Sequence, residues 1–420
     1  MSYDAFARVP VLPSEEDLAL ARRIAPVIRF AANEPFLPNH VGITVMTAPG
    51  LSPSAELMVG FEPGVARVVE YAIWWDWDIG HLYELEHVWL KLDGEGNIVR
   101  VDASAHGRLH AMTLPDGGLP LENGRVTLYS EPGKHAFHPT RDSVLEKRSM
   151  LNLACTDMAG NGQVLVNAMF AVPFAGITAT DHRAVKRYLQ ARAFSPSFIF
   201  DRLFDLASAE FLSWPDLHAY IARRVPEVLA AVRREQPLLK AVLLDSGDTL
   251  VDEATEIRDV DGYVVEAALI PGAREMVETL AAEGYRLALV ADGLVRSFET
   301  VLGHHGVRVH FETEAISEAL GCEKPAALMF DTALAALGLG AADTGAVVMV
   351  GNHLERDIKG ANRKGMISIW QNWSPRRPKV PADADEVPDY IVRNPSEIPQ
   401  LLAFIEQGMA RKQAVTALAS

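Results

Sequence analysis

Four polar clusters in the second half of the sequence each follow a short apolar segment or open a helical pattern. They are Asp245-Ser-Gly-Asp-Thr249, Ala291-Asp-Gly293, Glu323-Lys-Pro325 and Gly351-Asn-His-Leu-Glu-Arg-Asp357. A carboxylate can act as a covalent nucleophile or hold a hard cation such as Mg²⁺, and a lysine can stabilise phosphoryl charge. Asp245, Asp357 and Lys324 are therefore suited to phosphoryl chemistry on a small phosphorylated molecule.

A second group of metal-capable side chains lies in the first half of the chain. Asp76, Asp78 and His81 come just before Glu84 and Glu86. On a strand, Glu84 and Glu86 share one face, because side chains alternate with a period of two. Oxygen-rich clusters with a histidine suit Mg²⁺, Ca²⁺ or Mn²⁺ better than a structural zinc. The pattern fits both a second divalent-metal site and a solvated strand edge with incidental acids.

The elements that must position the first four clusters alternate between strand and helix from residue 238 onward. Strands are expected at 241–244, 287–290, 347–350, 367–370 and 390–392, and helices at 272–283, 295–305, 326–337 and 355–364. This alternation predicts a doubly wound α/β domain with a mostly parallel sheet. Ligands bind outside the carboxyl ends of such strands, so the four clusters are expected to meet in one crevice.

The first half of the chain predicts an antiparallel β-sandwich. Short apolar or alternating segments occur at 41–46, 65–75, 87–92, 98–103, 126–129 and 163–170, broken by Gly, Pro, Asn and Asp. A helix capped by Ser14 is expected to run to about Ile28. Further helices are expected at 181–192, 197–209 and 214–234, with Ser213 as a candidate N-cap and Pro226 dividing the last one.

These patterns predict a multidomain chain. Residues 1–178 are assigned to the β-sandwich with its N-terminal helix, and residues 179–236 to a helical connector. Residues 237–410 are assigned to the α/β domain and residues 411–420 to a C-terminal tail.

The bulk composition restricts the partners and the compartment. The chain has 420 residues and a formal net charge of -16, which disfavours nucleic acid or an anionic membrane as the main partner. No segment reaches the ~18 apolar residues of a membrane span, and the N-terminus lacks a signal-peptide pattern. Cys155 and Cys322 form no metal or disulfide motif, which favours a reducing compartment. We expect a cytoplasmic protein; the oligomeric state is left open.

Residues 238–408 resemble the haloacid dehalogenase-like (HAD) superfamily of hydrolases. The resemblance rests on the four clusters in their order and spacing, with Leu250 after the first and Phe330 after Lys324-Pro325. It implies a Rossmannoid sheet and a Mg²⁺-dependent phosphatase that passes through an aspartyl-phosphate on Asp245. The short stretch between Leu250 and Pro271 resembles the minimal-cap class.

The resemblance also implies roles for individual residues. Asp245, Asp248 and Lys324 would be catalytic. Mg²⁺ would be held by Asp245, Gly247 (through its carbonyl), Asn352 and Asp357. Substrate would be contacted by Thr249, Ala291, Asp292, Gly293 and Asn352.

Three positions depart from the family pattern. Family phosphatases usually place a second Asp two residues after the nucleophile as general acid/base, and here that position is Gly247, followed by Asp248. Ala291 replaces a Ser or Thr, and Asn352 replaces an Asp. Losing a positioned acid/base typically costs ~10²–10⁴ in rate. The pattern is therefore compatible with a slow phosphatase, with a proton supplied by Asp248 or by the other domain, or with a catalytically inactive ligand-binding or metal-binding scaffold.

Residues 65–140 resemble the β-sandwich of necrosis-inducing-protein-like and related vacuolar-sorting-type domains. The resemblance rests on Gly80-His81-Leu-Tyr83-Glu84-Leu-Glu86-His87, Ser104-Ala-His106-Gly107 and His135-Ala136. Tyr83 replaces a His and Glu84 replaces an Asp. The resemblance implies a divalent metal on His81, Glu84 and Glu86, joined by Asp76 or Asp78.

Overall fold

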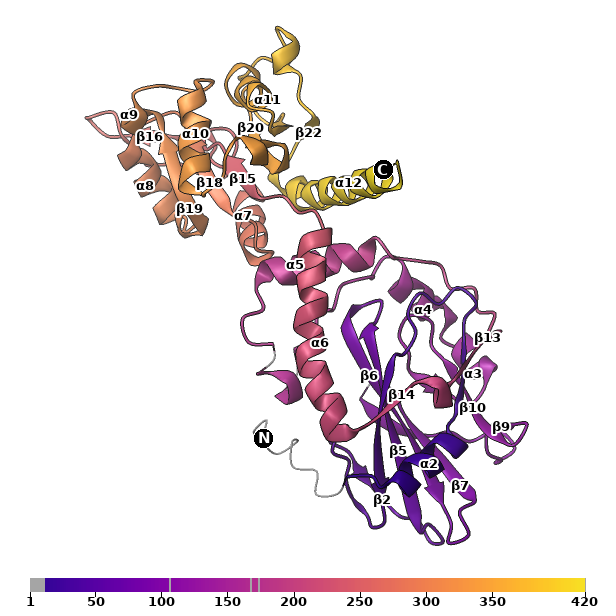
Figure 1. The fold of residues 1–420 in the computed structure, drawn as a ribbon. Coiled ribbons are helices and arrows are strands. Elements are labelled where there is room, and N and C mark those ends of the chain that lie inside the picture. Colours follow the sequence, from indigo (N-terminus) through magenta and orange to yellow (C-terminus); the bar gives the residue numbers. More distant parts are fainter. Residues whose placement is uncertain (1–11, 106, 167, 173, 420) are drawn as a thin grey trace. The chain divides into compact units, whose positions relative to one another are not determined.

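The computed structural model describes residues 12–419 except residues 106, 167 and 173. The chain divides into two compact units, shown in sequence colours in Figure 1. The first unit comprises Met1–Ile177 and Ala184–Gln236, and the second comprises Thr178–Arg183 and Pro237–Ser420.

The second unit is built on a six-stranded sheet in the order β19-β18-β15-β20-β21-β22, with every neighbouring pair parallel. Its strands are β15 (Ala241–Leu244), β18 (Leu287–Ala291), β19 (Phe311–Ile316), β20 (Val347–Gly351), β21 (Ile367–Gln371) and β22 (Tyr390–Val392). The chain winds outward on both sides of β15, which places a topological switch point beside Asp245. The predicted α/β class with a parallel sheet is confirmed.

The four apolar residues of β15 explain why this strand lies at the centre of the sheet. Val242 and Leu244 enter the hydrophobic core on one face, and Ala241 and Leu243 enter the core on the other. A strand that is buried on both faces needs this continuous apolar pattern. The helices of the unit are α7 (Ala273–Ala282), α8 (Val295–His304), α9 (Ser317–Leu320), α10 (Ala327–Ala336), α11 (Lys359–Arg363) and α12 (Ile398–Ala419). Helix α12 therefore continues through the segment predicted as a tail.

A small hairpin is inserted between β15 and α7. Strands β16 (Ile257–Arg258) and β17 (Val264–Glu266) pair antiparallel, and Ser297 Oγ of α8 accepts a hydrogen bond from Val264 N at 2.9 Å. This short insertion is consistent with the minimal-cap class expected from the sequence.

The first unit contains two mixed sheets. One has the order β14-β2-β5-β6-β7-β8 with β12 beside β6, and the other has the order β11-β10-β1-β13 with β9 beside β10. Their strands are β1 (Val27–Phe30), β2 (His40–Met46), β5 (Arg67–Trp77), β6 (His81–Leu92), β7 (Ile98–Ala105), β8 (Arg108–Ala111), β9 (Leu121–Glu122), β10 (Arg125–Ser130), β11 (Phe137–His138), β12 (Gln163–Val164), β13 (Arg202–Asp205) and β14 (Glu210–Ser213). A two-stranded ribbon pairs β3 (Gly50–Leu51) with β4 (Met58–Val59).

The expectation of a purely antiparallel domain is wrong at three pairings. Strands β1 and β10, β2 and β14, and β6 and β12 run parallel. In each pair the two strands are separated by a long stretch of chain, so no hairpin forces them to be antiparallel. The packing of the two sheets as a sandwich stays a prediction.

The helices of the first unit are α2 (Glu15–Ile24), α3 (Arg141–Leu145), α4 (Arg148–Cys155), α6 (Trp214–Glu235) and most of α5 (Ala179–Gln190). Ser14 caps α2 as expected, but the helix ends before Ile28 because β1 begins at Val27. Ser213 caps α6 and accepts a hydrogen bond from Asp216 N at 3.2 Å.

Two helix predictions between residues 197 and 234 are wrong. Residues 197–209 contain β13, which pairs with β1, so contacts distant in sequence override the local helical pattern. Helix α6 continues through Pro226 instead of dividing there, and it packs on β2 and β5 (Figure 1). Across the described ranges, the helices are all too short or too polar to cross a bilayer.

Candidate active site

Lys324 joins the two carboxylates that the sequence singled out. Its Nζ donates to Asp245 Oδ1 at 2.6 Å, to Asp357 Oδ1 at 2.6 Å and to the Val290 carbonyl at 2.9 Å. Asp245 directly follows β15, and Asp357 lies in the π-helical turn Leu354–Ile358 after β20. All three side chains are buried. The predicted convergence of the strand ends thus brings these three residues together.

The charges of this trio are strongly coupled. Burial raises the pKa of Asp357 to about 7, and the negative charge of Asp245 acts in the same direction, against Lys324. Burial lowers the pKa of Lys324, but Asp245, Asp357 and Asp292 outweigh it, so the net shift is upward and the ammonium stays charged. When both carboxyls are ionised, two carboxylates share one lysine, which leaves negative charge that a second cation would neutralise.

The donor set around this trio fits Mg²⁺. A Cβ at Gly351 would lie 2.2 Å from Asp357 Cγ, so only glycine lets the Asp357 carboxyl approach the end of β20 this closely. Asn352 directly follows β20 and is buried. Carboxylate and amide oxygens are the ligands that Mg²⁺ takes in proteins. Asp245, Asp357, Asn352 and the Gly247 carbonyl are the residues that would hold it.

The predicted substrate contacts lie around the same strand ends. Asp292 Oδ1 accepts from Lys324 N at 2.9 Å, and Gly293 N donates to Ser317 Oγ at 2.9 Å. Thr249 Oγ1 donates to Asp245 Oδ2 at 3.3 Å, so this hydroxyl orients the carboxylate. Ala291 is the buried last residue of β18.

A cavity of about 130 Å³ opens beside the loop after Asp245. One wall is formed by Ser246 and Gly247, a second by Asp292 and Gly293, and a third by the hairpin through Arg258. Glu253, which the sequence patterns did not indicate, also lines this cavity.

Asp248 points elsewhere. Its φ is 52°, its side chain is fully buried, and its carboxylate pairs with Arg376 and accepts from Glu253 N at 3.3 Å. Asp248 is not among the residues that line the cavity. Its catalytic role stays a prediction.

Glu253 is one of three acids that line this cavity, together with Glu256 and Asp292. Burial raises the pKa of its carboxyl, and the charges of Asp248 and Asp245 add to this, against Arg377. Arg377 Nη2 donates to Glu253 Oε2 at 2.6 Å. The only sequence signal for Glu253 is an acidic residue in the short insertion after Asp245, and such residues are common on solvated turns.

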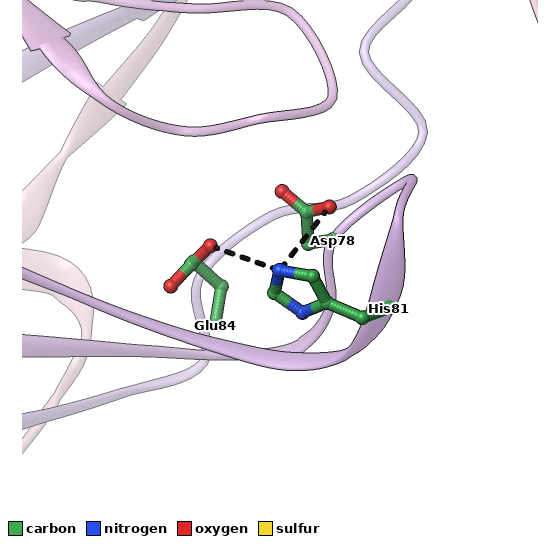
Figure 2. Close-up of side chains that lie close together, drawn as sticks. All are labelled: Asp78, His81 and Glu84. Carbon is green, nitrogen blue, oxygen red and sulfur yellow. Dashed lines mark ion pairs between the residues drawn. The ribbon is translucent and has the colours of Figure 1, made fainter. Parts of the chain in front are cut away.

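The first unit carries a separate cluster at the turn between β5 and β6. Figure 2 shows Asp78, His81 and Glu84 facing one another, and one ligand atom from each lies within 4.8 Å of the others. His81 Nε2 is 3.8 Å from Asp78 Oδ1 and 3.8 Å from Glu84 Oε2. Tyr83 has a φ of 61°, a backbone irregularity between His81 and Glu84.

The surroundings of this cluster differ from the predicted ligand set. Lys134 Nζ donates to Asp78 Oδ1 at 2.6 Å. Glu86 accepts a hydrogen bond from Ser104 Oγ and lines the same cavity of about 480 Å³ as His81 and Glu84. Asp76 instead accepts from Arg224 Nη2 at 2.8 Å. His81 and Glu84 thus come together with Asp78, and not with Asp76. His106 lies outside the described residues.

Comparison with known proteins finds a family match that includes the Asp245 site. Residues 180–365 match the family of haloacid dehalogenase-like hydrolases. The chain therefore carries a HAD-like hydrolase domain. The matched range contains Asp245, Lys324 and Asp357, whose geometry is described above.

Curated relatives of the HAD-like domain include phosphatases. A glyceraldehyde 3-phosphate phosphatase of Methanopyrus kandleri is 34% identical over 27% of this chain and 48% of its own length. A glyceraldehyde 3-phosphate phosphatase of Pyrococcus furiosus is 31% identical over 33% of this chain and 55% of its own length. A ribulose-1,5-bisphosphate 5-phosphatase of Halopiger xanaduensis is 32% identical over 31% of this chain and 54% of its own length. The chain thus spans about half the length of these relatives.

Proposed function

We propose that the HAD-like domain hydrolyses small phosphomonoesters with Asp245 as the nucleophile. The observation that supports this most is the Lys324 ammonium held between Asp245 and Asp357 at 2.6 Å from each. A lysine at this place neutralises charge on a phosphoryl group next to the attacking carboxylate. The relatives support the substrate class, because those above act on glyceraldehyde 3-phosphate or ribulose-1,5-bisphosphate.

The reaction proceeds in two displacements at phosphorus. An Asp245 carboxylate oxygen bonds to phosphorus while the bond to the leaving-group oxygen breaks, and that oxygen takes up a proton. Water then attacks the phosphorus of the aspartyl-phosphate, which releases inorganic phosphate and restores the carboxylate. Mg²⁺ held by Asp245, Asp357, Asn352 and the Gly247 carbonyl would supply further positive charge to the phosphoryl oxygens. Thr249 and Lys324 keep Asp245 oriented.

Gly247 stands where family phosphatases place the acid/base Asp, and this affects the expected rate of hydrolysis. A missing acid/base typically lowers the rate by ~10²–10⁴. The enzyme is therefore slow unless another group supplies the proton.

Phosphate release by the intact chain tests this proposal. The panel contains small phosphomonoesters, among them glyceraldehyde 3-phosphate, with and without Mg²⁺. We expect Mg²⁺-dependent release by the wild type and none above background by Asp245→Asn. Asp331→Asn is the control, because Asp331 is an exposed acid of the same domain that pairs with Lys364. Equal release by the wild type and Asp245→Asn would refute the proposal and favour an inactive ligand-binding domain.

We propose separately that Asp78, His81 and Glu84 hold a divalent cation, which would make the first unit a metal-binding scaffold. The three donors already lie within 4.8 Å of one another, as a shared ion requires. Lys134 competes, since it already neutralises Asp78. Burial raises the pKa of Asp78, but Lys134, His81 and His135 outweigh it and lower the net pKa, which keeps a potential ligand ionised.

Metal analysis of the purified chain tests the scaffold proposal. We expect a bound divalent metal that is lost in the double variant His81→Ala/Glu84→Gln. The matched control is His110→Ala/Glu95→Gln, which changes two exposed residues of the same unit. Wild-type protein that holds no metal after exposure to Mg²⁺, Ca²⁺ and Mn²⁺, and whose melting temperature these ions do not change, would rule this site out.

A further inference from the structure

Glu253 occupies the space that a side chain at position 247 would need. A Cβ built on Gly247 would lie 2.0 Å from Glu253 Oε1 and 2.9 Å from its Cδ. Glu253 begins the 3-10 turn Glu253–Thr255, and Asp252 caps this turn by accepting from Ala254 N at 2.9 Å. The turn brings the glutamate back over the loop that follows Asp245. Gly247 and Glu253 therefore form one arrangement, in which the absence of one side chain makes room for the other.

We infer that Glu253 is the general acid/base of the HAD-like site; this inference rests on the proposed phosphatase function. In the first displacement the Glu253 carboxyl gives its proton to the leaving-group oxygen as the bond to phosphorus breaks. In the second displacement the Glu253 carboxylate takes a proton from the attacking water. Each turnover thus returns Glu253 to its starting protonation state.

The position of Glu253 suits this role better than that of Asp248. Glu253 lines the cavity together with Ser246, Gly247 and Asp292, so it faces the space open to a leaving group. Asp248 is fully buried and pairs with Arg376. A group must reach the leaving oxygen directly or through one water to transfer a proton.

Arg377 is the positioning residue for Glu253. Its Nη2 donates to Oε2 at 2.6 Å, while Oε1 is the oxygen that lies over Gly247. One carboxyl oxygen is thereby held, and the other is directed toward the loop of the nucleophile. A charge-assisted contact of this length fixes the carboxyl group in one orientation.

The test compares two kinds of leaving group in the intact chain with Mg²⁺. Glu253→Gln keeps the shape of the side chain but cannot donate the proton. Leaving-group release in a single turnover isolates the first displacement, because hydrolysis of the aspartyl-phosphate is the same for every substrate. We expect this rate to fall ~10²–10⁴-fold for an alkyl phosphomonoester, and to fall far less for p-nitrophenyl phosphate, whose leaving group needs no proton. Glu266→Gln, at an exposed position of the same hairpin, is expected to leave both rates unchanged.

A second set of variants tests whether Glu253 occupies the space that a side chain at position 247 would need. Gly247→Asp alone is expected to lower activity, because its Cβ collides with Glu253. Gly247→Asp combined with Glu253→Ala is expected to recover alkyl phosphomonoester activity relative to Glu253→Ala alone. Failure of this recovery would overturn the assignment.

The outcomes distinguish failure of the Glu253 assignment from failure of the proposed phosphatase function. If Asp245→Asn abolishes turnover and Glu253→Gln lowers both rates equally or not at all, the role of Glu253 is refuted while the phosphatase remains. If the wild type and Asp245→Asn show the same background, the phosphatase function itself is refuted.

Discussion

The residues 247 and 248 determine how the loop after Asp245 is built. Asp248 adopts a φ of 52°, a region in which glycine is far more comfortable than an acid. The ion pair with Arg376 and the hydrogen bond from Glu253 N offset this strain. Gly247 has the opposite effect, since its missing side chain admits Glu253. Glu253 thus occupies the space that a side chain at position 247 would take, and it lines the cavity.

His87 contributes a pH-dependent part of the stability of the first unit. His87 is buried and stacks on Trp89 with ring centroids 5.4 Å apart. Burial lowers its pKa from 6.5 to about 3. Because the folded pKa lies below the unfolded one, the unfolded chain binds the extra proton between these values. Stability from this residue is complete above pH 6.5 and is lost as the pH falls toward 3.

We predict that His87→Leu removes this loss of stability at low pH. Relative to the wild type, the variant gains up to ~1.4 kcal/mol for each pH unit below about 6.5. Thermal unfolding between pH 7 and pH 4 measures the difference, with the exposed His110→Leu as control. Wild-type and His87→Leu melting curves that shift in parallel with pH would contradict the prediction.

Among the secondary-structure elements, α6 carries an evident local defect. The exposed Pro226 lies inside the helix and cannot donate a hydrogen bond to the carbonyl of Ala222. The helix persists because its buried face, including Leu217, Ile221 and Val225, packs in the first unit. Tertiary packing therefore outweighs the proline.

We predict that Pro226→Ala stabilises the first unit by about 2 kcal/mol. Alanine is favoured over proline in a helix interior by ~3 kcal/mol, less ~0.4–1 kcal/mol for the more flexible unfolded chain. Hydrogen exchange of the α6 amides in the intact chain measures the gain. Arg223→Ala, an exposed neighbour, is expected to change protection little. Faster exchange in Pro226→Ala would show that the proline is needed for the helix.

The elements differ in how far the sequence predicts them. Strands β15 and β20 are wholly buried and wholly apolar apart from Gly351, so their patterns mark them plainly. Strand β19 was not predicted, because it is an edge strand whose Glu312 and Glu314 pair with arginines. Strand β13 was predicted as helix, because its partner β1 is more than 150 residues away and only the folded chain supplies it.

The same distinction applies to the site. Asp245, Lys324 and Asp357 were predictable because each lies at a strand end or helix start of one parallel sheet. Glu253 was not predictable, because its approach to Gly247 depends on the turn at 253–255 and on Arg377. The Asp78 contact with His81 and Glu84 depends on the irregular backbone of Tyr83.

For the molecule as a whole, the net charge of -16 does not give the local charge at the HAD-like site. Locally, Lys324 pairs with Asp245 and Asp357, and Arg377 pairs with Glu253, so these acids have cationic partners. The division into units is also set by particular contacts. Arg183 joins the second unit because its Nη1 donates to the Glu283 carbonyl at 3.1 Å and its guanidinium lies 3.8 Å from the Tyr285 ring centroid.

The most direct test of the central claim is detection of a phosphoryl group on Asp245. The intact chain is incubated with Mg²⁺ and a phosphomonoester that it hydrolyses, quenched in acid, and analysed by mass spectrometry. We predict one phosphoryl group per chain, on the peptide that contains Asp245, and none in Asp245→Asn. Phosphate release with no such adduct in rapidly quenched samples, or with the adduct on another residue, would contradict the claim that Asp245 is the nucleophile.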